Sequence, residues 1–213
     1  MLVAPSMLAA DFGNMATEVK NIEKWGADIV HADVMDGVYV PNITFGMPMI
    51  KAFRQNSTLP IDAHLMITKP EKYVGKFCDA GADIVTFHPD ASDDVQGALD
   101  IIKSKGKKCG LVVNADVDFD VVKPYLGQID MLVIMTVQAG FGGQSFMPQC
   151  LAKAKLGATE REKHGYKYLI EVDGGVSEKN IALLKEAGVD IAVAGSSVFK
   201  SDNPQKTIES LHI

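Results

Sequence analysis

Short apolar segments rich in β-branched residues alternate with longer amphipathic segments along the chain. Near-continuous apolar runs such as Met131–Met135 are typical of strands that are buried on both faces, as in parallel sheets. The pattern therefore predicts an α/β protein. We expect eight strands, at Leu2–Pro5, Ile29–Asp33, Ile61–Leu65, Ile84–His88, Lys108–Val113, Met131–Met135, Tyr168–Asp173 and Ile191–Ala194.

The segments between these strands carry helix signals. Val19, Ile22 and Trp25 recur three residues apart and form one apolar stripe. Ser177 offers an N-cap to a helix that would end before Gly188. These signals predict helices at Met15–Trp25, Met47–Gln55, Pro70–Ala80, Asp93–Lys105, Asp118–Tyr125, Pro148–His164, Glu178–Ala187 and Pro204–His212.

A similar turn precedes three of the predicted strands. Gly26-Ala27-Asp28, Gly81-Ala82-Asp83 and Gly188-Val189-Asp190 come before strands two, four and eight, which indicates a repeated βα unit. No linker rich in Pro, Ser or Gly interrupts the pattern. Eight such units in 213 residues predict one domain over residues 1–213, a single (β/α)₈ TIM barrel. An open doubly wound sheet is the competing architecture.

Composition narrows the class of protein. Hydrophobic residues make up 47% of the chain and charged residues 23%, which is typical of a globular protein. The net charge of −6, without a long basic run, argues against a nucleic-acid partner. The cysteines, Cys78, Cys109 and Cys150, form no CxxC pair, which favours reduced thiols in the cytoplasm. We expect neither a signal peptide nor a membrane span.

Polar residues stand where the predicted strands end, which in a TIM barrel is the catalytic face. These positions hold Ser6, His31 with Asp33, His64, His88, Asn114, Thr136, Asp173 and Gly195-Ser196. Four of them, from three strands, could converge on a metal ion: His31, Asp33, His64 and Asp173. Such a mixed nitrogen and oxygen set suits Zn²⁺, Mn²⁺, Fe²⁺ or Co²⁺ better than Ca²⁺ or Mg²⁺, without choosing among the four.

Glycine clusters follow the last three predicted strands. They are Gly140-Phe141-Gly142-Gly143, Gly174-Gly175 and Gly195-Ser196-Ser197. Glycine lets backbone N–H groups approach an anion, and the loops after strands seven and eight are the usual phosphate site of a TIM barrel. Neither a GxGxxG nor a GxxxxGK[ST] pattern is present, so a dinucleotide fold and a P-loop are not indicated.

Other strand-end residues allow two interpretations. Met35, Met66 and Met135 either fill the core or form an apolar collar around the metal. His88 reads more readily as a hydrogen-bonded core residue than as a ligand. Asn114 reads equally well as a turn former and as a site residue.

Motifs in order along the chain resemble those of the ribulose-phosphate 3-epimerase family. They lie within residues 4–12, 31–37, 40–42, 62–66, 135–137, 140–144, 171–175 and 194–196, and the resemblance covers essentially the whole chain. It implies a TIM barrel of the ribulose-phosphate-binding type, usually a homo-oligomer. It also implies the interconversion of D-ribulose 5-phosphate and D-xylulose 5-phosphate by two-carboxylate proton transfer through a metal-stabilised cis-enediolate.

The resemblance also implies roles for individual residues. Matched position by position, the metal ligands are His31, Asp33, His64 and Asp173, and the two aspartates are the acid/base pair. The residues that would touch the substrate or its phosphate are Ser6, His64, Gly140, Phe141, Gly142, Gly143, Gly174, Gly175, Gly195 and Ser196.

Two segments depart from the family pattern. Ala139 stands where the family usually has Pro, and the segment His88-Pro89-Asp90-Ala91 carries a Pro that the commoner form lacks. These departures keep D-allulose 6-phosphate open as an alternative substrate. A metal-free decarboxylase or synthase on the same scaffold is disfavoured, because such relatives carry Lys at the position of Met35. A non-catalytic sugar-phosphate-binding barrel would require the four ligand groups to be vestigial.

Overall fold

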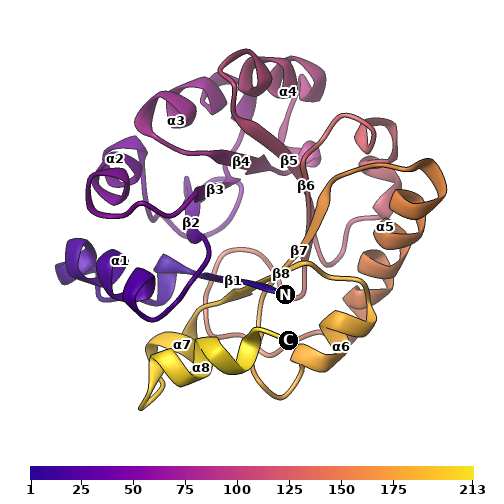
Figure 1. The fold of residues 1–213 in the computed structure, drawn as a ribbon. Helices are drawn as coiled ribbons and strands as arrows, with labels where there is room; N and C mark the ends of the chain where they lie inside the picture. Colours follow the sequence, from indigo (N-terminus) through magenta and orange to yellow (C-terminus); the bar gives the residue numbers. More distant parts are fainter.

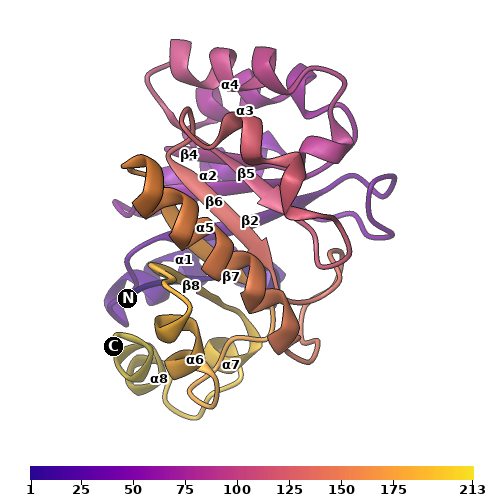
Figure 2. The same cartoon turned by 90° about the vertical axis from the view of Figure 1, so that its right-hand side faces the viewer.

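Parallel strands form a nearly closed barrel, and helices surround it (Figures 1 and 2). The structure is a computed structural model and describes residues 1–213. The hydrogen-bonded order is β1-β8-β7-β6-β5-β4-β3-β2, and a bridge between Ser6 and His31 joins β2 to β1. This arrangement confirms the TIM barrel and excludes the open sheet. The strands are β1 Leu2–Pro5, β2 Val30–Met35, β3 Ile61–Met66, β4 Ile84–Phe87, β5 Lys108–Val113, β6 Met131–Met135, β7 Leu169–Asp173 and β8 Ile191–Ala194.

The helices follow the predicted order with different bounds. Two predicted helices, those that begin at Pro70 and Pro148, start with a 3₁₀ turn. The α-helices are α1 Met15–Lys24, α2 Met47–Asn56, α3 Val74–Ala80, α4 Val95–Ser104, α5 Leu151–His164, α6 Ile181–Glu186, α7 Ser196–Phe199 and α8 Pro204–Leu211. The 3₁₀ helices are η1 Met7–Ala9, η2 Phe12–Asn14, η3 Pro70–Lys72, η4 Pro89–Ala91, η5 Phe119–Val121, η6 Lys123–Tyr125 and η7 Pro148–Cys150.

The helix predicted over Asp118–Tyr125 is wrong. The segment forms two short 3₁₀ turns, η5 and η6, instead of one α-helix. Pro124 explains the difference, since it lacks an N–H and its ring would clash with the carbonyl of Asp120 one turn earlier. The connection from β5 to β6 therefore contains no α-helix.

The helix predicted to start at Glu178 begins later, at Ile181. Ser177 is not its N-cap. The Ser177 N–H instead donates to Oδ1 of Asn180 at 2.9 Å, and Nδ2 of Asn180 donates to the Gly175 carbonyl at 2.9 Å. Asn180 thus folds the segment after β7 into a turn, which holds the Gly174-Gly175 loop against the start of α6.

Alternation along each strand divides the core in two. On β6, Leu132 and Ile134 face outward into a large apolar cluster beneath the helices, whereas Met131, Val133 and Met135 belong to a smaller cluster inside the barrel. The three cysteines are free and buried. None of the helices has the length and apolar character that crossing a membrane requires.

At the amino-terminal end of the barrel, an aspartate occupies the same position in four turns and hydrogen-bonds to the neighbouring strand. The turns before β2, β4, β6 and β8 end in Asp28, Asp83, Asp130 and Asp190. Each aspartate donates its N–H to the preceding odd-numbered strand and accepts an N–H from the same strand residue with its carboxylate. The sequence pattern revealed three of these turns, and Asp130 supplies the fourth. The same pair of hydrogen bonds therefore occurs in all four odd–even strand pairs, including β5–β6, whose connection contains no α-helix.

Candidate active site

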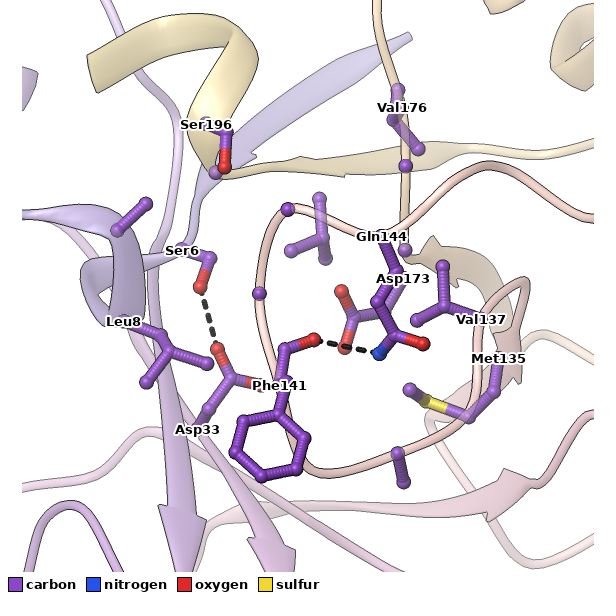
Figure 3. A pocket seen from close by; sticks show the side chains of 18 of the residues that line it. Ser6, Leu8, Asp33, Met135, Val137, Phe141, Gln144, Asp173, Val176 and Ser196 are labelled. Atoms are coloured by element: carbon purple, nitrogen blue, oxygen red, sulfur yellow. Dashed lines mark hydrogen bonds between the residues drawn. The ribbon is translucent and has the colours of Figure 1, made fainter. Parts of the chain in front are cut away.

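A cavity of about 200 Å³ opens at the carboxyl ends of the strands. Figure 3 shows Ser6 and Asp33 on one wall and Asp173 and Met135 on the other, with Phe141 on the loop in between. The predicted residues that line the cavity are Ser6, Asp33, Met35, Met66, Met135, Gly140, Phe141, Gly142, Gly143, Asp173, Gly174, Gly175, Gly195 and Ser196. The side chains of the other two, His31 and His64, lie fully buried next to Asp33 and Asp173.

The four predicted metal ligands meet at one point. Nε2 of His31 lies 3.3 Å from Oδ1 of Asp33 and 3.8 Å from Oδ2 of Asp173. Nδ1 of His64 lies 3.4 Å and 3.5 Å from the same two oxygens. All four ligand atoms are within 4.8 Å of one another. The strand register produces this convergence, because Asp33 pairs with His64 across β2 and β3.

These donors fit a divalent metal ion. The ring nitrogens that face the carboxylates, Nε2 of His31 and Nδ1 of His64, are buried without a hydrogen-bond partner. Leaving such a group unpaired costs about 1–3 kcal/mol, which coordination would remove. In a tetrahedral site with bonds of about 2.0–2.2 Å, ligand atoms are roughly 3.3–3.6 Å apart. The distances between the imidazole nitrogens and the carboxylate oxygens lie close to that range.

The imidazoles and carboxylates of this cluster shift one another's pKa values. Burial raises the pKa of Asp33, but the neighbouring His31 and His64 outweigh it and hold that pKa far below its usual range. Burial lowers the pKa of His31, whereas the carboxylates of Asp33 and Asp62 raise it well above the usual value. Hydrogen bonding to Asp173 and Asp33 likewise outweighs burial and raises the pKa of His64. Protons and a cation therefore compete for these two imidazoles.

Ser6 reaches the site across the seam of the barrel. Its hydroxyl donates to Oδ2 of Asp33 at 2.6 Å, the contact drawn in Figure 3. The bridge between Ser6 and His31 fixes this approach, because it brings the end of β1 beside β2. One Asp33 oxygen thus faces the serine while the other faces the histidines.

The glycine loops after β7 and β8 line the cavity and precede α6 and α7. Gly174 and Gly175 have φ values of +121° and +68°, which favour glycine. A Cβ on Gly175 would lie 2.6 Å from the backbone nitrogen of Phe146. The N–H groups of Gly175 and Gly195 donate to no backbone oxygen. They are therefore free to bind an anion at this end of the cavity.

The loop after β6 is held in place by side-chain amides. Nε2 of Gln144 donates to the carbonyls of Gln138 and Phe141 at 2.6 Å and 2.8 Å. Nδ2 of Asn42, from the loop after β2, donates to the Gly140 carbonyl at 2.9 Å. Two loops from opposite sides of the barrel thus meet at Gly140, which lines the cavity.

Residues that the sequence reasoning missed lie beside and below the ligands. Asp62 and Glu171 are fully buried in the barrel interior, next to His31. Their spacing was a usable signal, because each precedes a predicted ligand by two residues on the same strand and so shares its face. Gln144, which lines the cavity, carried no such signal.

His88 and Asn114, for which the sequence allowed two interpretations, have different surroundings. His88 is fully buried and stacks on His64 with ring centroids 5.1 Å apart. Asn114 does not line the cavity, and its Nδ2 donates to the Tyr39 hydroxyl at 2.5 Å. The methionines serve both interpretations, since they line the cavity and also pack in apolar clusters.

Two solved structures have the same fold. A structure of KGPDC from Streptococcus mutans, in complex with D-R5P, superposes with a TM-score of 0.77 at 15% identity and covers 98% of this chain and 94% of its own. The 3-hexulose-6-phosphate synthase of Salmonella typhimurium superposes with a TM-score of 0.74 at 19% identity, over 99% and 96%. At such identities these matches support the fold alone.

Sequence comparisons are more specific. The ribulose-phosphate 3-epimerase of Bacillus subtilis (strain 168) is 42% identical over 210 residues, which cover 98% of this chain and 97% of that protein. The enzyme of the same name from Escherichia coli (strain K12) is 41% identical over 211 residues, covering 99% and 94%. The family model described as the ribulose-phosphate 3 epimerase family matches residues 2–199. The chain is therefore an enzyme of the ribulose-phosphate 3-epimerase family.

Proposed function

We propose that this chain interconverts D-ribulose 5-phosphate and D-xylulose 5-phosphate, and that one domain over residues 1–213 does so with a divalent metal ion. The convergence of two carboxylates and two imidazoles carries the proposal. The family membership and the relatives named ribulose-phosphate 3-epimerase support the choice of substrate.

Asp33 and Asp173 are the proposed acid/base pair. They come from β2 and β7 and face each other across the cavity (Figure 3). Inversion at carbon 3 requires the proton to leave one face and another to arrive on the opposite face, so a group is needed on each side. One carboxylate starts ionised and removes the proton, giving a cis-enediolate. The other starts protonated, protonates the opposite face, and exchanges roles with its partner in the reverse direction.

His31, His64, Asp33 and Asp173 are the proposed holders of the metal ion, which is Zn²⁺, Mn²⁺, Fe²⁺ or Co²⁺. A divalent ion at this position would supply Lewis-acid stabilisation of the negative charge that develops on the substrate oxygens. The Ser6 hydroxyl holds Asp33 in position at 2.6 Å and lies on the cavity wall, where it can also contact the sugar.

The glycine loops are the proposed phosphate site. The unpaired N–H groups of Gly175 and Gly195 point to this role, together with the start of α7 at Ser196. The loop from Gly140 to Gly143 would cover the lower half of the sugar. Anchoring the phosphate uses binding energy away from the reacting carbon to align the substrate.

Replacing each acid/base group tests the proposal. Asp33→Asn and Asp173→Asn should each lower kcat for ribulose 5-phosphate at least about a hundredfold, since each removes one proton carrier. In heavy water, the unmodified enzyme should place deuterium on carbon 3. Turnover of allulose 6-phosphate on the same metal-analysed sample provides the substrate comparison. Unchanged turnover in both variants would contradict the acid/base assignment, and faster turnover of allulose 6-phosphate would contradict the substrate.

A further inference from the structure

Each of the two histidines in the metal cluster uses only one ring nitrogen to face the carboxylates. His31 points Nε2 at Asp33 and Asp173, whereas His64 points Nδ1 at them. The opposite nitrogen of each ring therefore lies on the far side of the cluster. Both rings are completely buried, so water does not reach these far nitrogens. Whatever protein group contacts them decides which nitrogen of each ring carries the proton.

Behind His31 lies a pair of buried carboxyl groups. Nδ1 of His31 is 2.8 Å from Oδ2 of Asp62 and 3.5 Å from Oε1 of Glu171. Both Nδ1 and the Asp62 Oδ2 atom are buried and make no well-aligned hydrogen bond, and their 2.8 Å contact is the shortest that His31 makes with a carboxylate. A carboxylate oxygen at this distance is an acceptor for an N–H. This contact places the proton of His31 on Nδ1 and leaves the lone pair of Nε2 directed at the cluster.

Behind His64 lies a third imidazole. Nε2 of His64 is 2.9 Å from Nε2 of His88. At this distance one nitrogen must donate and the other accept. His64 needs the lone pair of Nδ1 for the cluster, so its proton is on Nε2, and His88 must accept with its own Nε2. His88 therefore carries its proton on Nδ1, the atom that has no hydrogen-bond partner.

We infer that Asp62, with Glu171, and His88 are positioning residues that set the two metal-binding histidines in opposite tautomers, Nδ1–H in His31 and Nε2–H in His64. This inference rests on the metal site of the proposed function. The wrong tautomer would present an N–H instead of a lone pair to the cation. Outer groups of this kind typically change metal affinity or activity by about 10–100-fold.

The inference gives a role to three buried polar residues that the acid/base mechanism does not use. Asp62 is paired in register with His31, on the neighbouring strand. Glu171 and His88 stand on or just after β7 and β4. Burying each of these polar side chains in the barrel interior costs free energy unless it forms a hydrogen bond or an ion pair. Apart from the Thr86 hydroxyl, which donates to Oδ1 of Asp62 at 3.4 Å, their close polar contacts are with His31 and His64.

Nitrogen NMR on the unmodified chain tests the tautomers directly. With ¹⁵N-labelled histidine and one equivalent of Zn²⁺, the spectra should show protonated Nδ1 on His31 and on His88, and protonated Nε2 on His64. A proton on Nε2 of His88, or on Nε2 of His31, would overturn the inference. So would binding of two zinc ions per chain, because it would make Asp62 and Glu171 ligands of a second ion.

Zinc affinity of matched variants tests the effect on the metal. By competition with a chelating dye, His88→Phe and Asp62→Ala should raise the zinc dissociation constant about 10–100-fold. His88→Gln and Asp62→Asn keep an acceptor oxygen and should stay within about threefold of the unmodified chain. Circular dichroism of the metal-free proteins checks that each variant folds. Folded His88→Phe and Asp62→Ala variants with unchanged affinity would overturn the inference while leaving the proposed epimerisation intact. A parent chain that binds no zinc would overturn the proposed metal site itself.

Discussion

Asp36 is a single residue that joins the loops after β2 and β3 by hydrogen bonds. Its Oδ1 atom accepts the N–H groups of Val38 and Tyr39, both at 2.9 Å, within the loop after β2. Its Oδ2 atom accepts the N–H and the hydroxyl of Thr68, at 2.8 Å and 2.6 Å, in the loop after β3. Burial raises the pKa of Asp36, but these four hydrogen bonds outweigh it and lower the pKa to about 2.

We predict that Asp36→Asn destabilises the fold in a pH-dependent way. The folded pKa of about 2 lies below the ordinary value of 3.8, so the ionised carboxylate stabilises the protein at neutral pH. That contribution is lost as the pH falls from about 4 toward about 2. After allowance for solvent screening, the loss at pH 7 should be about 1 kcal/mol. Urea unfolding at pH 7 and pH 3 measures the difference in free energy of unfolding between the parent chain and Asp36→Asn. The exposed Asp202→Asn serves as the control. A difference that is equally large at both pH values would refute the role given to the ionised Asp36 carboxylate.

The histidines of the metal cluster make a second prediction at this scale. The nearby carboxylates raise the pKa of both His31 and His64, which favours the protonated form of each ring in the metal-free protein. Zinc binding should then displace protons, and the apparent zinc affinity should rise with pH, by up to about tenfold per unit for each displaced proton. Calorimetric titration in buffers of different ionisation enthalpy counts the protons released. A release of none would show that both imidazoles are already neutral.

At the scale of elements, the repeated aspartates join each odd strand to the turn that precedes the next even strand. The carboxylates of Asp28, Asp83, Asp130 and Asp190 accept from the N–H groups of Val3, Ile61, Cys109 and Ile170 at 2.8–3.1 Å. These N–H groups lie at or near the starts of strands. Asp83 and Asp190 also pair with Arg54 and Arg161. The amino-terminal end of the barrel is thereby fixed independently of the catalytic end.

Asp130 offers the simplest test of these hydrogen bonds, because it makes no ion pair. Asp130→Ala should lower the free energy of unfolding by about 1–2 kcal/mol, since it leaves the Cys109 N–H without its acceptor. Asp130→Asn keeps an acceptor oxygen and should lose less than half as much. Urea denaturation measures both. The kcat for ribulose 5-phosphate should stay unchanged, because the turn lies at the opposite end of the barrel from the cavity. Equal losses of unfolding free energy in the two variants would argue against the hydrogen bond.

At the scale of the molecule, the sequence pattern predicted the barrel and the convergence of the proposed metal ligands but not every connection between strands. Apolar runs that end in His or Asp identify both a buried strand and its catalytic end, so His31, Asp33, His64 and Asp173 were predictable. The β5–β6 connection was not, because the helical periodicity of Asp118–Tyr125 competes with Pro124. The four-residue helix α7 is too short to show a period. The contacts of Asp62 and Glu171 with His31 could not be predicted, because they depend on how the strands are arranged in the closed barrel.

The proposed metal site also links distant parts of the barrel, because the four side chains that would hold the ion come from β2, β3 and β7. A cation held there binds the folded chain alone, since the unfolded chain does not bring the four groups together. Zinc at about a hundred times its dissociation constant should therefore stabilise the protein by about 2.7 kcal/mol. For a chain of this length, removing the metal with a chelator should lower Tm by roughly 5–10 °C. Differential scanning calorimetry with and without chelator measures the shift, and Asp173→Asn serves as the control in which the shift should be much smaller. A Tm that does not change in the parent chain would show that the four side chains hold no stabilising ion.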